Sequence, residues 1–346
     1  YTAVRYLKEN AENINTIVDG LCEQSQAMIS SEDGITFDNF NGKKQIIPPV
    51  TDLEIGHPYE CRDPKVWREN GRYFMCIASS YKKEEGVLLI YTSDDGENWT
   101  YLNRLQDKQF GTVLECPDVF CIDGQHILIA SPIGVLKDTD YPGNQSTMQK
   151  LSFDAGDGSM ALESEAQFLD YGMDLYAPQS CIDEAGRRCV IAWVRMPIPQ
   201  SPDDNEAADG RSWSGMMSLP RVVTLRGGEI YTSVHPNVRE YFAENSCEES
   251  TEKYTRWTKD GRSRTVLTLR EGQSVELAGV MIELNGGCVC TDRTKRVPQG
   301  VDVHVKCCTP GVGDVCELEV YEEKNLIEIF VNDGQYVISN VLYPCR

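Results

Sequence analysis

Histidine and positive charge are both scarce in this chain of 346 residues. Only four His occur, and 33 Lys and Arg stand against 54 Asp and Glu, which gives a net charge of −21 and an isoelectric point near 4.6. No Ser or Cys is placed to use one of these His as a base, which disfavours Ser-His-Asp and Cys-His hydrolases. A surface this acidic repels phosphate backbones, so we expect no nucleic-acid binding.

Long apolar runs and phosphate loops are also absent. No apolar run reaches 18 residues, so we expect no membrane span. No Gly-rich phosphate loop occurs. The chain opens at Tyr1-Thr2-Ala3-Val4, inside an apolar run and without an initiator Met. We therefore expect the true N-terminus to be absent from the printed chain, so that it gives no targeting signal.

The 14 cysteines are too dilute for a disulfide scaffold. Several lie in strand-like runs, which predicts reduced, buried thiols in a cytoplasmic protein. One cluster gathers in the C-terminal part of the chain, formed by Cys288, Cys290, Cys307 and Cys308. It lacks Cys-x-x-Cys spacing and has one nearby His, His304, so we expect no zinc there, and no metal or cofactor elsewhere.

Helical periodicity is nearly absent, and short apolar runs broken by Gly, Asn and Asp predict an all-β fold. The strand-like runs are 65–67, 73–79, 87–92, 119–122, 127–130, 188–194, 216–225, 265–269, 318–321 and 326–331. Asn70-Gly71, Asp123-Gly124 and Gly227-Gly228 predict hairpin turns. The segment 7–21 could be a helix or a long loop, and a loop insertion is favoured.

A Ser-x-Asp-Gly-x-x-aromatic pattern occurs twice, at 31–37 and 93–99. An Asp-Gly turn closed by a packed aromatic residue is typical of an outer hairpin in a β-propeller blade, and two copies about one blade apart predict radially repeated sheets. The alternative is two unrelated hairpin turns. Composition further predicts a loop over 196–211 and a domain boundary over 243–262, with a small β-sandwich after it.

Two acidic motifs lie at the starts of two successive strand-rich units. They are Arg62-Asp63-Pro64 and Glu115-Cys116-Pro117-Asp118. Equivalent positions in successive sheets predict that the fold brings Asp63 and Glu115 together. Glycosidic bond cleavage needs such a pair, because one carboxyl group must hold a proton for the leaving oxygen while the other stays ionised against the charge on the sugar.

The chain resembles glycoside hydrolase family 32, the β-fructosidases, nearly from end to end. Five segments in order carry the resemblance: the two acidic motifs, Asp174-Leu175-Tyr176-Ala177-Pro178-Gln179, 213–221 and 327–334. The resemblance implies a five-bladed β-propeller followed by a C-terminal β-sandwich. With the compositional boundary, it predicts a propeller domain over 1–242 with an incomplete first blade, a linker region over 243–262 and a sandwich over 263–346.

The resemblance also implies a retaining mechanism with a covalent fructosyl–enzyme intermediate. Glu115 would be the general acid/base, and Asp63 would stabilise the transition state through the fructose hydroxyls, with Arg62 beside it binding a hydroxyl. Further predicted substrate-binding residues are Cys116, Asp118, Asp174, Tyr176 and Trp213. For Asp118, orienting Glu115 and capping a turn stay open; for Trp213, core packing is the alternative. Packing roles are expected for Trp67, Trp99 and Trp193, and a domain-boundary contact for Trp257.

One departure from the family is important. Its nucleophile is an Asp in a Trp-x-Asn-Asp-Pro-Asn-Gly type motif at the first strand, and no such motif occurs in this sequence. A strand like that at Tyr1-Thr2 lies well after this Asp in the family. We therefore expect the printed chain to lack the beginning of the first blade, together with the nucleophile, and to be inactive by itself.

Three functional classes remain open. The first is a β-fructofuranosidase acting on sucrose, sucrose 6-phosphate or a fructo-oligosaccharide, with Lys137 and Arg211 as candidates for a 6-phosphate contact. The second is a degenerate paralogue that binds fructosides without cleaving them. The third is a related five-bladed hydrolase of arabinans or xylans, which the Glu-Cys-Pro-Asp motif and the segment 330–334 disfavour. The oligomeric state is not predicted.

Overall fold

The computed structural model describes residues 1–6, 22–135, 143–198, 213–244, 246–300 and 303–343. It is built almost entirely of antiparallel strands, which confirms the all-β prediction. The chain divides into two compact units, residues 1–167 and 168–346. The predicted loop over 7–21 lies outside the described residues, as do Lys137, Arg211 and most of the predicted loop over 196–211.

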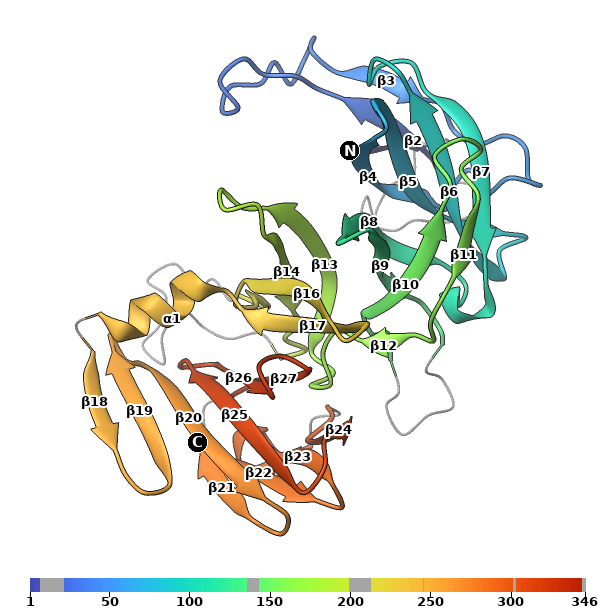
Figure 1. Ribbon diagram of the computed structural model, residues 1–346. Helices are drawn as coiled ribbons and strands as arrows, with labels where there is room; N and C mark the ends of the chain where they lie inside the picture. The colour runs from blue at the N-terminus through green and yellow to red at the C-terminus, as the bar shows by residue number, and fades with distance from the viewer. Residues whose placement is uncertain (7–21, 136–142, 199–212, 245, 301–302, 344–346) are drawn as a thin grey trace. The chain divides into compact units, whose positions relative to one another are not determined.

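The first unit contains three antiparallel sheets, which follow one another along the chain from blue to green in Figure 1. The first sheet has β1 (Thr2–Tyr6), β2 (Cys22–Met28) and β3 (Lys44–Ile47). The second has β4 (Cys61–Glu69), β5 (Arg72–Tyr81), β6 (Glu85–Ser93) and β7 (Thr100–Gln106). The third has β8 (Leu114–Ile122), β9 (Gln125–Pro132), β10 (Thr147–Phe153) and β11 (Met160–Leu162), and β12 (Gln167–Phe168) pairs with β10. A 3₁₀ turn, η1 (Lys108–Phe110), precedes β8.

The two central strands of the second sheet, β5 and β6, are buried on both faces, which explains why they are nearly continuous apolar runs. Phe74 and Cys76 of β5 belong to a core shared with Leu114, Val119 and Leu128 of the third sheet. The intervening residues, Met75 and Ile77, pack on the other side with Ile47 of β3. Successive side chains of a strand point to opposite faces, so one strand serves both cores. Trp67 and Trp99 pack against these cores, as predicted.

The two Ser-x-Asp-Gly segments form the same turn. In each, the Gly N–H donates to the Ser hydroxyl, over 3.0 Å at Ser31 and 2.9 Å at Ser93, and the Asp carboxylate accepts the two following backbone N–H groups. Gly34 and Gly96 both have positive φ, 72° and 78°, a conformation that favours glycine. The closing aromatics differ, because Trp99 packs into the core whereas Phe37 is exposed.

The second unit begins with a sheet ordered β13 (Leu175–Ile182), β14 (Arg188–Val194), β16 (Arg221–Arg226) and β17 (Glu229–Val234), with β15 (Met216–Met217) paired to β14. A helix, α1 (Pro236–Ala243), follows; the sequence analysis did not predict it. His235 caps it by accepting the Asn237 N–H, and Pro236 occupies its first turn. Trp193 on β14 is 42% exposed and lies outside the buried core, although its ring lies close to Gly215.

Two further sheets of the second unit pack face to face over an apolar core. The larger is ordered β18 (Cys247–Ser250), β19 (Tyr254–Lys259), β20 (Arg262–Arg270), β25 (Val315–Glu322), β26 (Leu326–Val331) and β27 (Tyr336–Val341). The smaller has β21 (Ser274–Leu277), β22 (Val280–Asn285), β23 (Cys288–Asp292) and β24 (Lys306–Gly311), and η2 (Thr294–Arg296) follows β23. Within 243–262, predicted as a linker, β18 and β19 pair with each other and β19 pairs with β20. The predicted domain boundaries stay a prediction.

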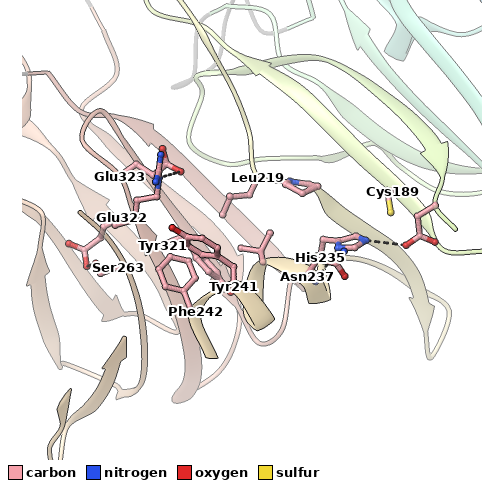
Figure 2. A pocket seen from close by; sticks show the side chains of 14 residues that line it. Cys189, Leu219, His235, Asn237, Tyr241, Phe242, Ser263, Tyr321, Glu322 and Glu323 are labelled. Atoms are coloured by element: carbon pink, nitrogen blue, oxygen red, sulfur yellow. Dashed lines mark hydrogen bonds and ion pairs between the residues drawn. The ribbon is translucent and has the colours of Figure 1, made fainter. Parts of the chain in front are cut away.

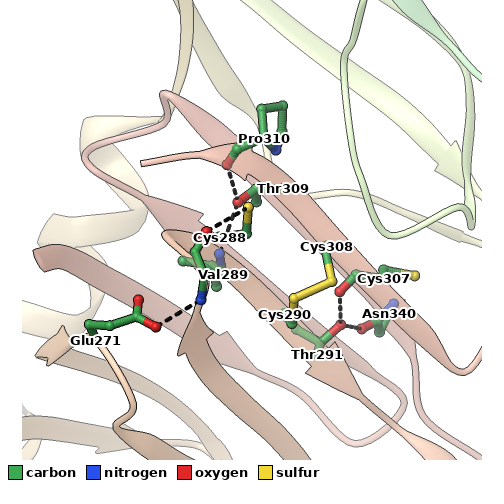
Figure 3. The surroundings of a disulfide bond; sticks show 11 residues. Glu271, Cys288, Val289, Cys290, Thr291, Cys307, Cys308, Thr309, Pro310 and Asn340 are labelled. Atoms are coloured by element: carbon green, nitrogen blue, oxygen red, sulfur yellow. Dashed lines mark hydrogen bonds between the residues drawn. A yellow bond between two sulfur atoms is a disulfide. The ribbon is translucent and has the colours of Figure 1, made fainter. Parts of the chain in front are cut away.

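The cysteine cluster contains a disulfide. Cys290 and Cys308 lie directly opposite each other on β23 and β24 and are bonded, with 4.1 Å between their Cα atoms (Figure 3). The expectation of reduced thiols is therefore wrong for this pair. Cys307 points elsewhere, because its thiol is buried and donates to the Gly172 carbonyl. Exposed thiols also occur, at Cys121, Cys181 and Cys247, so burial does not hold for all the cysteines.

Candidate active site

Three strands carry the same β-bulge, and each bulge contains a proline. In β4, β8 and β13, two residues oppose one residue of the partner strand, at Asp63-Pro64, Cys116-Pro117 and Ala177-Pro178. The residue before each Pro has positive φ, 60°, 51° and 52° respectively. Proline is tolerated at a bulge because it has no N–H for the ladder, and a bulge turns neighbouring side chains out of the regular alternation.

The bulges of β4 and β8 bring the two predicted catalytic carboxylates into one hydrogen-bonded group. The Asp63 carboxylate accepts the Cys116 backbone N–H over 2.9 Å. Arg62 Nη2 donates to Glu115 Oε1 over 2.8 Å, and Arg62 Nε lies 4.0 Å from Asp63 Oδ2. The side chains of Asp63 and Glu115 remain 29% and 23% exposed, so a small solute can reach both.

Residues of the first sheet hold this group in place through hydrogen bonds. The Asp63 N–H donates to the Thr2 hydroxyl over 3.0 Å, and that hydroxyl donates to Gln26 Oε1 over 3.1 Å. The Gln26 amide donates in turn to the Cys61 carbonyl over 2.8 Å, and Gln24 Oε1 accepts the Cys61 N–H. These buried glutamines fix the strand entering the bulge, so Asp63 is held by its backbone as well as by its carboxylate.

A third carboxylate, Glu60, was missed by the sequence analysis. It forms an ion pair with Arg62, so one guanidinium serves both Glu60 and Glu115. Its position two residues before Arg62 on the same chain segment is the signal that could have revealed it. The group therefore combines three carboxylates with one guanidinium.

Burial is the main influence on ionisation in this group. It raises the pKa of Asp63, and the Cys116 N–H and Arg62 act against it. Burial likewise raises the pKa of Cys116 to about 12, so its thiol stays protonated at neutral pH. The raised pKa is therefore that of Asp63, the residue proposed to stay ionised, and it gives no support to Glu115 as the acid.

Asp118 takes a role that was not predicted. It is buried, and its Oδ2 lies 3.0 Å from Lys65 Nζ, which joins β8 to β4. For Asp118, orientation of Glu115 and capping of a turn both stay predictions.

The remaining predicted binding residues lie in the second unit. Asp174 is buried against Arg293, whose Nη2 donates over 3.0 Å, and it accepts the Val341 N–H over 2.8 Å. Arg195 stacks over the Tyr176 ring at 4.7 Å. Trp213 packs beside the core cluster that contains Tyr343. These contacts favour structural roles, and substrate binding by the three residues stays a prediction.

The second unit also contains a cavity of about 570 Å³ (Figure 2). Its walls are largely apolar, and Asp183, Cys189 and His235 lie together on its lining, with possible metal-ligating atoms within 4.8 Å of one another. Each of the three has a protein partner. Asp183 pairs with Arg187 and accepts from His235, and His235 caps α1 through Nδ1. The Cys189 thiol donates to the Arg187 carbonyl. A metal bound to His235 Nε2 would place the ring proton on Nδ1, and Nδ1 could then no longer accept the Asn237 N–H that caps α1. This disfavours a metal here.

None of the described helices is long and apolar enough to cross a membrane.

Comparisons with known proteins give a consistent result. Residues 10–234 match the family described as the glycosyl hydrolases family 32 N-terminal domain. A sucrose-6-phosphate hydrolase of Vibrio alginolyticus is 29% identical over 300 residues, which span 81% of this chain and 58% of that protein. One of Bacillus subtilis is 28% identical over 354 residues, 94% of this chain and 69% of that protein. The chain thus spans about three fifths to two thirds of the length of these relatives.

A solved structure shares the fold. The Bombyx mori GH32 β-fructofuranosidase superposes with a TM-score of 0.73 at 22% identity, covering 94% of this chain and 69% of that one.

Proposed function

Because the chain belongs to glycosyl hydrolase family 32, we propose that it is the β-fructosidase part of a retaining glycoside hydrolase. It cleaves the β-fructofuranosidic bond of a small carbohydrate, either sucrose or sucrose 6-phosphate. The observation that carries the proposal is the bulge pair, which holds Asp63 and Glu115 around one guanidinium. The names of the relatives support the substrate class. The proposed architecture is a five-bladed propeller followed by a sandwich.

In the proposed mechanism, Glu115 first protonates the leaving glucosyl oxygen and later removes a proton from water. Arg62 donates to Glu115 Oε1 and so helps to hold the carboxyl group in place. Asp63 accepts hydrogen bonds from the fructose hydroxyls, and these bonds strengthen as the ring gains positive charge. The covalent step belongs to the Asp of the family's Trp-x-Asn-Asp-Pro-Asn-Gly type motif, which the printed sequence does not contain.

A second function is binding of fructosides without hydrolysis. The site would then keep its hydroxyl-binding contacts at Asp63 and Arg62 and would have no turnover.

The deciding experiment measures release of fructose from sucrose and sucrose 6-phosphate by the full gene product and by its Glu115→Gln variant. The rate on both sugars should fall about 10²- to 10⁴-fold in the variant, the usual contribution of a positioned acid or base. An aryl fructoside with a good leaving group should be affected much less. Glu97→Gln, in an exposed turn, is the matched control. Hydrolysis that survives Glu115→Gln would overturn the assignment, and wild-type binding without hydrolysis would establish the second function.

A further inference from the structure

A second pair of cysteines faces each other across neighbouring strands. Cys181 of β13 and Cys189 of β14 are register partners, as are Gln179 and Ile191 before them. Directly opposed residues of an antiparallel pair point to the same face, with Cα atoms about 4.5 or 5.5 Å apart. Both separations fall within the range of roughly 4.4–6.8 Å that a disulfide spans. The backbone therefore places these two thiols where they can be bridged.

The same chain shows what this register allows. Cys290 and Cys308 are also register partners on adjacent antiparallel strands, and they are disulfide-bonded (Figure 3). Cys181 and Cys189 have the corresponding relationship but are present as thiols. The two pairs lie on different sheets of the second unit, so the bonded pair is an internal reference for the unbonded one.

The two thiols differ in access, which sets an order of reaction. Cys181 is exposed, whereas Cys189 is only 8% exposed and lines the cavity near His235 (Figure 2). The Cys189 thiol donates to the Arg187 carbonyl over 3.6 Å. Burial raises the pKa of Cys189, and the negative charge of Asp183, with that of Cys181 when it is ionised, adds to the shift. An external reagent thus meets Cys181 first.

We propose that Cys181 and Cys189 form a redox modification site, which closes to a disulfide on reaction with a small-molecule disulfide such as oxidised glutathione. The Cys181 thiolate attacks one glutathione sulfur, forming a mixed disulfide and releasing one glutathione thiolate. The Cys189 thiolate then attacks the Cys181 sulfur and releases the second. The two cysteine protons pass to the released thiolates, so two protein thiols are oxidised and one glutathione disulfide is reduced to two glutathione molecules.

The test incubates the native protein with oxidised glutathione, alkylates the remaining thiols after unfolding, and analyses tryptic peptides by mass spectrometry. Arg187 and Arg188 lie between the two cysteines, so trypsin separates them unless a disulfide joins the peptides. We expect a linked Cys181–Cys189 peptide pair that dithiothreitol splits. Cys121 and Cys247 are also exposed but face His126 and Thr258, so they should stop at the glutathione mixed disulfide.

Variants separate the site from general thiol reactivity. In Cys189→Ser, Cys181 should stop at the mixed disulfide, as Cys121 does. In Cys181→Ser, Cys189 should remain a thiol and be recovered alkylated. The proposal is overturned if wild-type Cys181 yields only the mixed disulfide with Cys189 alkylated, since the pair would then behave as two separate thiols. It is also overturned if Cys189 reacts equally well in Cys181→Ser. Either variant decides the matter if the other fails to fold.

Discussion

Arg221 of β16 and Glu328 of β26 form a buried ion pair, with 2.9 Å between Nη2 and Oε1 and each side chain 1% exposed. Asp170 completes the group at 2.7 Å from the same nitrogen, and the Ser339 hydroxyl accepts from it. Arg221 ends one segment that carries the family resemblance, and Glu328 lies in another. These two segments therefore meet in a buried polar group of the second unit, whereas Arg62-Asp63-Pro64 and Glu115-Cys116-Pro117 build the candidate site.

Arg221→Met should destabilise the protein by about 3–5 kcal/mol, because it leaves Asp170 and Glu328 buried without a cation. The midpoint and slope of urea unfolding measure this loss. The matched control is Lys295→Met, which removes an exposed pair with Glu276 and should cost less than about 1 kcal/mol. Equal losses in the two variants would show that the buried group contributes no more than a surface pair.

Asp63→Asn should stabilise the protein at neutral pH. Burial raises the pKa of Asp63 in the folded state, so the folded chain binds this proton more tightly than the unfolded chain and loses stability as pH rises through that interval. The variant has no carboxyl group to ionise at this position, so it does not lose this stability as pH rises. Its asparagine can still accept the Cys116 N–H. We expect its Tm to exceed that of the wild type at pH 7, with the difference vanishing below about pH 4, the ordinary range of Asp. A Tm difference that does not change with pH would show that the raised pKa of Asp63 is not its cause.

Asp95 should show the opposite dependence. Hydrogen bonds from the Asn98 backbone and side chain, and from the Glu97 N–H and the Ser93 hydroxyl, lower the pKa of Asp95. A lowered folded-state pKa stabilises the fold above the unfolded value, and this gain is lost as pH falls through the folded value. Asp95→Ala should therefore lower Tm at pH 7, and the loss should shrink in acid. Asp33→Ala should follow the same course if the two turns are true repeats.

Much of this structure could be predicted from local patterns. The apolar runs of β5, β6, β9 and β26 are long enough to identify as strands, and the Asp-Gly turns depend on residues within seven positions. The pairing of Asp63 with Glu115 followed from their equivalent places in two successive units. Such features depend on nearby residues or on repetition, and both can be read from one sequence.

Other features depend on distant partners and could not be predicted in this way. The ion pair of Lys65 with Asp118 and the Cys290–Cys308 disulfide need the register of strands that only the folded chain defines. Helix α1 is two turns long and carries too weak a periodic pattern to be distinguished from a loop. The recurring residue–Pro bulge was present in the sequence as Asp63-Pro64, Cys116-Pro117 and Ala177-Pro178, and comparing the three would have revealed it.

The central claim is that the bulge pair binds a fructosyl unit, and calorimetric titration of fructose into the printed polypeptide tests it most directly. The measurement is independent of hydrolysis, so the question of the nucleophile does not enter. The wild type should bind, and Asp63→Asn should bind at least about tenfold more weakly, a loss of roughly 1.4 kcal/mol. Asp95→Asn, in the exposed turn, should bind like the wild type. A wild type that does not bind fructose, or an Asp63→Asn variant that binds it equally well, would contradict the account.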